Sequence, residues 1–404
     1  EVIAEYRSLI ASAPREPRFV VELAQVLLSV GRRDEAISLA ESTGRKHPRD
    51  VAVHRALADL YTRFGEERRA ASEIALLARI DAQDPAHLIA LGAQQLGEGN
   101  REAAITTFRR ILTAVRDRGE AHGTLARVYA DHDLLDLAEQ EYRLAVTSMP
   151  DEVRSLRGLA EVLERIREGE TRSDRQRRDL DAIASWQKVL EGSGDDRVAR
   201  REARRRIVGI WARRGQLRSR VAEWERAFDA TPPDAEAGRF LAEARLQTRP
   251  PDTAGALAVL AKLSEIAPGD IESLLALERA RVAAGDRAGA IDVLGRLLEA
   301  DPRRAPHYLE RMSEHAHALY RDGDAVRYAE EAVRRQPDDA QAHRRLGDLY
   351  RARQDMDRAV ASYNRAIERN DRLFSTYFEL AEIHVAAGRL TEADRLYRHV
   401  LRLC

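Results

Sequence analysis

His315 and His317 are the residues whose type first suggests chemistry, because imidazoles bind metals and transfer protons near neutral pH. Two residues apart on an expected helix, they point to different faces, and no HExxH or cysteine–histidine spacing accompanies them. We therefore interpret both as surface histidines. Carboxylates are so abundant that a close pair is expected by chance, and none has a recognisable catalytic partner. The sequence predicts no catalytic residue and no metal ligand.

Motifs for nucleotides and for nucleophilic catalysis are also missing. The sequence has no GxxxxGK[ST] phosphate loop, no GxGxxG after a strand and no GxSxG nucleophile elbow. Its single cysteine, Cys404, excludes an internal disulfide framework. No run of about 18 apolar residues predicts a membrane span. We expect a protein that is not an enzyme and that needs no cofactor.

Arginine clusters are the most prominent charged feature. The whole chain of 404 residues has a formal net charge of -1, but residues 165–220 hold seventeen Arg or Lys and nine Asp or Glu. On a helix, the arginines of the densest stretch, 197–206, would spread around the circumference as a basic collar. Because stacking aromatic residues are not interleaved, an acidic protein surface is a better partner for this collar than nucleic acid. The basic collar consists of Arg197, Arg200, Arg201, Arg204, Arg205 and Arg206.

A 34-residue period must position these side chains. A leucine followed by a small residue recurs at this step, as do an alanine and a glycine further along each unit. The pattern predicts a helix, a turn and a second helix, with small residues where the two antiparallel helices approach closely. The recurring residues are Leu23-Ala24, Leu57-Ala58, Leu91-Gly92, Leu125-Ala126 and Leu159-Ala160, then Ala36, Ala70, Ala104 and Ala138, and Gly31, Gly65 and Gly99.

This pattern resembles the tetratricopeptide repeat family, and residues 119–152, with Tyr129, Tyr142 and Pro150, match it best. The resemblance covers essentially the whole chain and implies an all-α fold, a right-handed α-solenoid superhelix of helix-turn-helix repeats. Both ends are cut inside the pattern, so we expect a piece of a longer protein. The expected organisation is 1–14, the second helix of a truncated repeat ending in Pro14; 17–152, repeats; 153–200, a repeat with a charged insertion at 164–179; and 201–404, further repeats with the last one truncated.

The charged insertion departs from the period. Residues 164–179 contain one aliphatic residue, Ile166, so they cannot add to the core. They form either an extension of both helices of the repeat or a mobile loop.

In the family that this chain resembles, the first helices line a concave face on which peptides or partner helices bind. One first-helix position carries arginine in six repeats, among them Arg205, and in four of these an acid follows at i+4. The pairs are either a solvated series of intrahelical ion pairs, worth roughly 0.3–0.5 kcal/mol each, or guanidinium groups available to an acidic peptide. We call these residues the arginine ladder; it comprises Arg55, Asp59, Arg157, Glu161, Arg239, Glu243, Arg279, Arg344 and Asp348.

We therefore expect a non-catalytic scaffold or adaptor in a multiprotein bacterial assembly. It would bind a peptide or a partner protein in its concave groove, and the bound surface could be acidic. Two alternatives remain open. The chain could be the sensor or autoinhibitory region of a larger enzyme, or a periplasmic arm of an envelope or exopolysaccharide export complex. The sequence leaves the localisation open between the cytoplasm and the periplasm, and it predicts neither the partner nor the oligomeric state.

Overall fold

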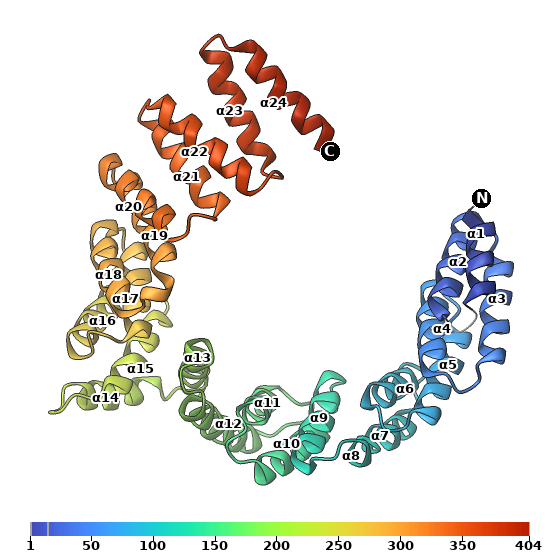
Figure 1. Cartoon of the computed structure of the whole chain (residues 1–404). Helices are drawn as coiled ribbons and strands as arrows, with labels where there is room; N and C mark the ends of the chain where they lie inside the picture. Colours follow the sequence, from blue (N-terminus) through green and yellow to red (C-terminus); the bar gives the residue numbers. More distant parts are fainter. Residues whose placement is uncertain (1, 14–15, 404) are drawn as a thin grey trace. The chain divides into compact units, whose positions relative to one another are not determined.

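The computed structural model describes residues 2–13 and 16–403, and within these ranges the chain forms helices and no strand. The helices follow one another as antiparallel pairs joined by short turns (Figure 1). The chain divides into two compact units, one ending at Ala203 and the other beginning at Arg204. The all-α helix-turn-helix fold expected from the 34-residue period is confirmed. Pro14, where we expected the first helix to end, lies outside the described residues, and so does Cys404.

In the first unit, a single helix precedes the helix pairs, and the second helix of the third pair is divided in two. The elements are α1 (Val2–Ser12), α2 (Pro17–Ser29), α3 (Arg33–Lys46), α4 (Val51–Arg63), α5 (Glu67–Ile80), α6 (Pro85–Gly97), α7 (Arg101–Arg109), α8 (Ile111–Ala114), α9 (Arg118–Asp131), α10 (Leu135–Ser148), α11 (Val153–Glu164) and α12 (Arg172–Gly192). The division between the units falls inside the next helix, α13 (Arg197–Arg213).

The second unit continues the same order of first and second helices. Its elements are α14 (Leu217–Phe228), α15 (Ala235–Leu246), α16 (Thr253–Ile266), α17 (Ile271–Ala283), α18 (Arg287–Ala300), the short 3-10 helix η1 (Pro302–Arg304), α19 (Ala305–Ala318), α20 (Asp322–Arg335), α21 (Ala340–Ala352), α22 (Met356–Arg369), α23 (Phe374–Ala386) and α24 (Leu390–Leu403). No helix within the described ranges combines the length and the apolar content needed to cross a membrane.

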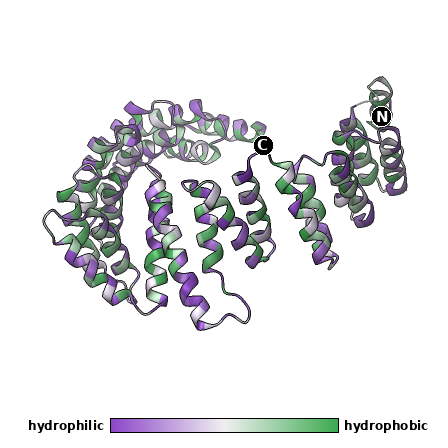
Figure 2. Cartoon of the chain, turned by 90° about the horizontal axis from the view of Figure 1, so that it is seen from below, coloured by the Kyte–Doolittle hydropathy of each residue, from purple (hydrophilic) through white to green (hydrophobic). Residues whose placement is uncertain are grey.

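The recurring leucine and small residue lie where helices pack. Leu57 and Leu125 are almost completely buried, whereas Leu91 is only half-buried. A Cβ atom added to Gly92 would lie 2.2 Å from a ring carbon of Phe108, and one added to Gly347 would lie 2.6 Å from a ring carbon of Tyr363. The small residue therefore makes room for an aromatic ring of the second helix. Each helix accordingly carries both apolar and polar residues along its length (Figure 2).

The turn inside most of the repeats contains a residue with a left-handed backbone. Gly31, Gly65 and Gly99 have φ values of 77°, 69° and 81°, a conformation that costs glycine nothing. At the same point of later repeats, Asp133 and Gln354 adopt φ values of 59° and 60°. The turn geometry is thus kept where glycine is replaced.

Acidic residues begin many of the first helices. Asp50, Asp84, Asp234 and Asp339 each accept hydrogen bonds from backbone N–H groups in the first turn of the helix that follows. These caps satisfy donors that a helix start leaves without partners. A carboxylate at this point of a repeat is therefore part of the fold, whatever else it does.

The charged insertion lengthens one helix of its repeat. The first helix, α11, ends at Glu164, whereas the second, α12, begins at Arg172 and runs for 21 residues. Arg167 forms ion pairs with Asp136 (2.6 Å) and Glu139 (2.7 Å) of α10. Of the two alternatives for this segment, the extension of both helices is wrong, because only α12 is extended. Ion pairs of Arg167 tie the connecting segment to the preceding repeat.

Candidate functional site

Four arginines of the arginine ladder connect consecutive repeats. Arg55 on α4 lies 3.1 Å from Asp84, which caps α6, and Arg239 on α15 lies 2.7 Å from Asp270, which caps α17. Burial lowers the pKa of Arg239, but the hydrogen bonds and charge of Asp270 raise it more, so the net shift is upward. Each of these guanidinium groups is engaged by an acid of the next repeat.

The other ladder residues follow related arrangements. Arg157 has the expected i+4 partner, Glu161, at 3.1 Å and also pairs with Glu202. Arg344 pairs with Glu379 at 3.2 Å, on the first helix of the next repeat.

The i+4 acids meet other groups as well. Glu243 accepts a hydrogen bond from Gln247 (2.9 Å), and Asp348 accepts one from the hydroxyl of Tyr363 (2.7 Å). Asp59 and Arg279 are exposed on their helices. The interpretation of the ladder as purely intrahelical pairs is incomplete, because most of the described arginine contacts cross from one repeat to the next.

The arginines of the basic collar on α13 differ in how far they are exposed. Arg201 and Arg205 are exposed, whereas Arg204 is 3% exposed, as buried as its helix neighbours Ala203 and Ile207. The remaining collar residues are half-buried; these are Arg197, Arg200 and Arg206.

The guanidinium group of Arg204 forms ion pairs with two glutamates of the second unit. It pairs with Glu236 of α15 and donates a hydrogen bond to Glu272 of α17 (Nη2 to Oε2, 3.0 Å). Burial lowers the pKa of Arg204, but hydrogen bonds to Glu272 and Glu236 raise it more. Arg204 therefore joins the first helices of three successive repeats, and the expectation that it faces a partner needs correction.

A pocket of about 190 Å³ opens between α19, α20 and α21 in the second unit. Buried small side chains and one leucine form its apolar part: Ala329, Ala332, Ala342 and Leu349. Charged and polar side chains surround them: Glu310, Ser313, Glu314, His317, Arg345 and Asp348. The first helices α19 and α21 thus supply most of the lining.

The two histidines of α19 differ in environment. His315 is 6% exposed, and its Nε2 lies 3.3 Å from the Oε1 atom of the buried Glu278. His317 is exposed, with Nδ1 3.0 Å from Asp322. The interpretation of both as surface histidines is wrong for His315, because it lies one helical turn after the buried Met312.

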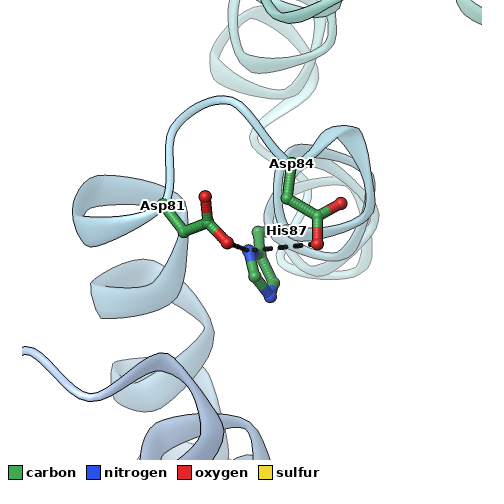
Figure 3. Close-up of side chains that lie close together, drawn as sticks. All are labelled: Asp81, Asp84 and His87. Carbon is green, nitrogen blue, oxygen red and sulfur yellow. Dashed lines mark ion pairs between the residues drawn. The ribbon is translucent and has the colours of Figure 1, made fainter.

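Another group of side chains was missed by the sequence analysis. Asp81, at the end of α5, lies beside Asp84 and His87 at the start of α6 (Figure 3). One ligand atom from each residue lies within 4.8 Å of the other two. The signal in the sequence is the spacing D-x2-D-x2-H, which differs from HExxH and from cysteine–histidine motifs. These are the described residues that could hold a metal ion.

Comparison with known families agrees with the repeat architecture. Tetratricopeptide repeat models match residues 21–85, 89–153, 313–373 and 376–404, which together exceed half of the chain. The chain belongs to the tetratricopeptide repeat family. Residues 154–312, which include the charged insertion and the basic collar, lie outside these matches.

Solved structures share helical repeats with this tetratricopeptide repeat protein. One described as "Crystal structure of MamA" is 19% identical, with 39% of this chain and 92% of that chain covered and a TM-score of 0.34. Another, "MamA 41-end from Desulfovibrio magneticus RS-1", is 20% identical, with 42% and 94% covered and a TM-score of 0.34. At these values the likeness adds nothing to the family assignment. No curated protein sequence matches the chain.

Proposed function

We propose that this tetratricopeptide repeat protein is a non-catalytic scaffold, and that a partner protein or peptide binds on the first helices α19 and α21. The pocket between these helices is the observation that supports the proposal. Its apolar part is built from small side chains, so it has room for an apolar side chain of a partner. Tetratricopeptide repeats imply protein partners, which supports a protein or peptide as the occupant that we propose for this pocket.

The charges around the pocket favour a basic residue next to the apolar anchor. Arg345 is paired with Glu310, and Asp348 accepts a hydrogen bond from Tyr363. The exposed Glu314 adds a carboxylate at the rim. A peptide with an apolar side chain followed by lysine or arginine would match both the apolar part and this rim.

Site-specific photocrosslinking tests this proposal. A photoreactive amino acid placed at Glu314 should give discrete crosslinked products with a partner in cells, because this position borders the pocket. The matched control is Arg365, which is exposed on α22 and does not line the pocket. Equal products from both positions, or none from Glu314, would contradict the assignment of the binding face.

The basic collar is a second candidate surface because two of its arginines are exposed. We propose that Arg201 and Arg205 meet an acidic partner protein. Replacing both with glutamate should weaken that binding at least about tenfold and remove its salt dependence, since like charges then oppose each other. Helicity should not change, because arginine and glutamate have similar helix propensity. Binding with unchanged affinity and salt response would exclude the collar as a binding surface.

A further inference from the structure

The turn between α5 and α6 holds a histidine nitrogen in an unusual position. His87 is 5% exposed, and its Nδ1 is a buried atom without a hydrogen-bond partner. Buried polar atoms of proteins almost always have such a partner, so an orphaned one calls for a physical explanation. The ring points Nδ1 between the carboxylates of Asp81 and Asp84 (Figure 3).

The two carboxylates are placed as fellow ligands rather than as hydrogen-bond acceptors. The Oδ2 atoms of Asp81 and Asp84 lie 3.6 Å and 3.8 Å from Nδ1, which exceeds hydrogen-bond length. Two ligand atoms bonded at about 2.1 Å to one tetrahedral metal ion lie about 3.4 Å apart. The distances therefore approach those of atoms that share a metal ion, and a small closure of the turn would complete the geometry.

Equivalent turns show which part of this arrangement is ordinary. Asp84 caps α6 through Oδ1, which accepts a hydrogen bond from the N–H of Ala86 (2.9 Å), as other acids cap other first helices. At the turn before α19, Asp301 occupies the place of Asp81, and it accepts a hydrogen bond from Tyr308 (3.0 Å). What sets the turn between α5 and α6 apart is the buried His87 together with Asp81.

We propose that Asp81, Asp84 and His87 bind a zinc ion. One imidazole nitrogen with two carboxylate oxygens suits zinc, whereas magnesium and calcium favour six or more oxygen ligands. The side chains of Asp81 and Asp84 are 34% and 31% exposed, so an ion can reach the site from solvent. The fourth position is left for water or for a side chain of a partner. The ion ties the second helix of one repeat to the first helix of the next.

Arg55 competes with the ion. Its Nη2 lies 3.1 Å from Asp84 Oδ2 and 3.2 Å from His87 Nε2. In this arrangement Nε2 accepts a hydrogen bond, so the proton of a neutral ring is on Nδ1. Binding of zinc through Nδ1 moves that proton to Nε2, and Arg55, whose side chain is 55% exposed, must then withdraw. Arg55 therefore holds the site in its metal-free form.

Titration of the full, chelator-treated chain with zinc chloride tests the proposal by calorimetry. The wild-type chain should bind one zinc ion more tightly than any other sites it has. Asp81→Asn should lower that affinity at least about tenfold, and Arg55→Gln should raise it, because a repelling charge and a competing donor are removed. His307→Ala, which changes an exposed histidine outside the cluster and outside the pocket, should leave it unchanged.

Cobalt(II) supplies a second readout, because its visible absorption is far stronger in tetrahedral than in octahedral surroundings. The wild-type chain should give the tetrahedral spectrum, and Asp81→Asn should lose it. Asp81 is partly exposed, so this variant keeps the fold even where a His87 variant does not. The proposal is overturned by zinc binding that is equal in the wild type and Asp81→Asn, by an absence of zinc binding, or by an octahedral cobalt spectrum.

Discussion

Replacing Leu125 with aspartate should destabilise the first unit by about 4 kcal/mol or more, because a buried leucine is lost and a carboxylate is placed where it has no partner. Leu125 is 0% exposed on α9, between the buried Ala121 and Tyr129. Each repeat buries its apolar face only against adjacent repeats. The loss of structure should therefore extend from α9 to the neighbouring helices α10 and α11. Urea unfolding followed by circular dichroism measures the loss.

Leu144→Asp is the matched control. Leu144 lies on α10, the second helix of the same repeat, and is 47% exposed. The same chemical change there should alter stability by no more than about 0.5 kcal/mol. If the two variants unfolded at the same urea concentration, the assignment of Leu125 to the packed position of the repeat would be refuted.

The repeat itself could be predicted from the sequence because its signals are local and recur. Leucine with a following small residue marks the packed face of a first helix, and glycine marks the turn. The structure adds the reason for the small residue: at Gly92 the space is filled by Phe108, and at Gly347 by Tyr363. Sequence spacing alone shows that a side chain is small, but it does not show which ring fills the space.

The partners of charged residues could not be predicted in the same way. The i+4 rule concerns a single helix, whereas Arg55 and Asp84 are brought together by the packing of consecutive repeats. The pairing of His54 with Glu73 (2.5 Å), which recurs two repeats later between His122 and Glu141 (2.6 Å), likewise joins two helices. Such contacts depend on how the helices are oriented, and that orientation is set by many packed residues together.

The basic collar illustrates the same difficulty on one helix. Charge counting identified the arginines of α13, but helical periodicity does not state which of them faces the neighbouring helix. Arg204 does, and its side chain is 4% exposed. An arginine is usually exposed unless acids pair with it, and here those acids are Glu236 and Glu272, the latter 68 residues further along the chain. No local pattern could have connected them.

The burial of Arg204 leads to the second large effect that we expect. Arg204→Met should destabilise the second unit by about 3 kcal/mol, because the carboxylate of Glu272, whose side chain is only 12% exposed, loses its counter-charge. We place the effect at the lower end of the range for broken buried pairs, since Glu236 is 31% exposed and keeps Arg239 as a partner at 2.9 Å. Methionine resembles the aliphatic part of the arginine side chain and has a similar helix propensity, so the change mainly removes the charged guanidinium group.

Two further variants separate the charge from the packing. Arg201→Met, on the exposed side of α13, should change stability by no more than about 0.5 kcal/mol. The double variant Arg204→Met with Glu272→Gln should be more stable than Arg204→Met alone, because it removes the charge that the single change leaves unpaired. If Arg204→Met and Arg201→Met were equally stable, Arg204 would not be a buried, paired residue but an exposed one like Arg201. No recovery in the double variant would contradict the assignment of the lost stability to the unpaired charge of Glu272.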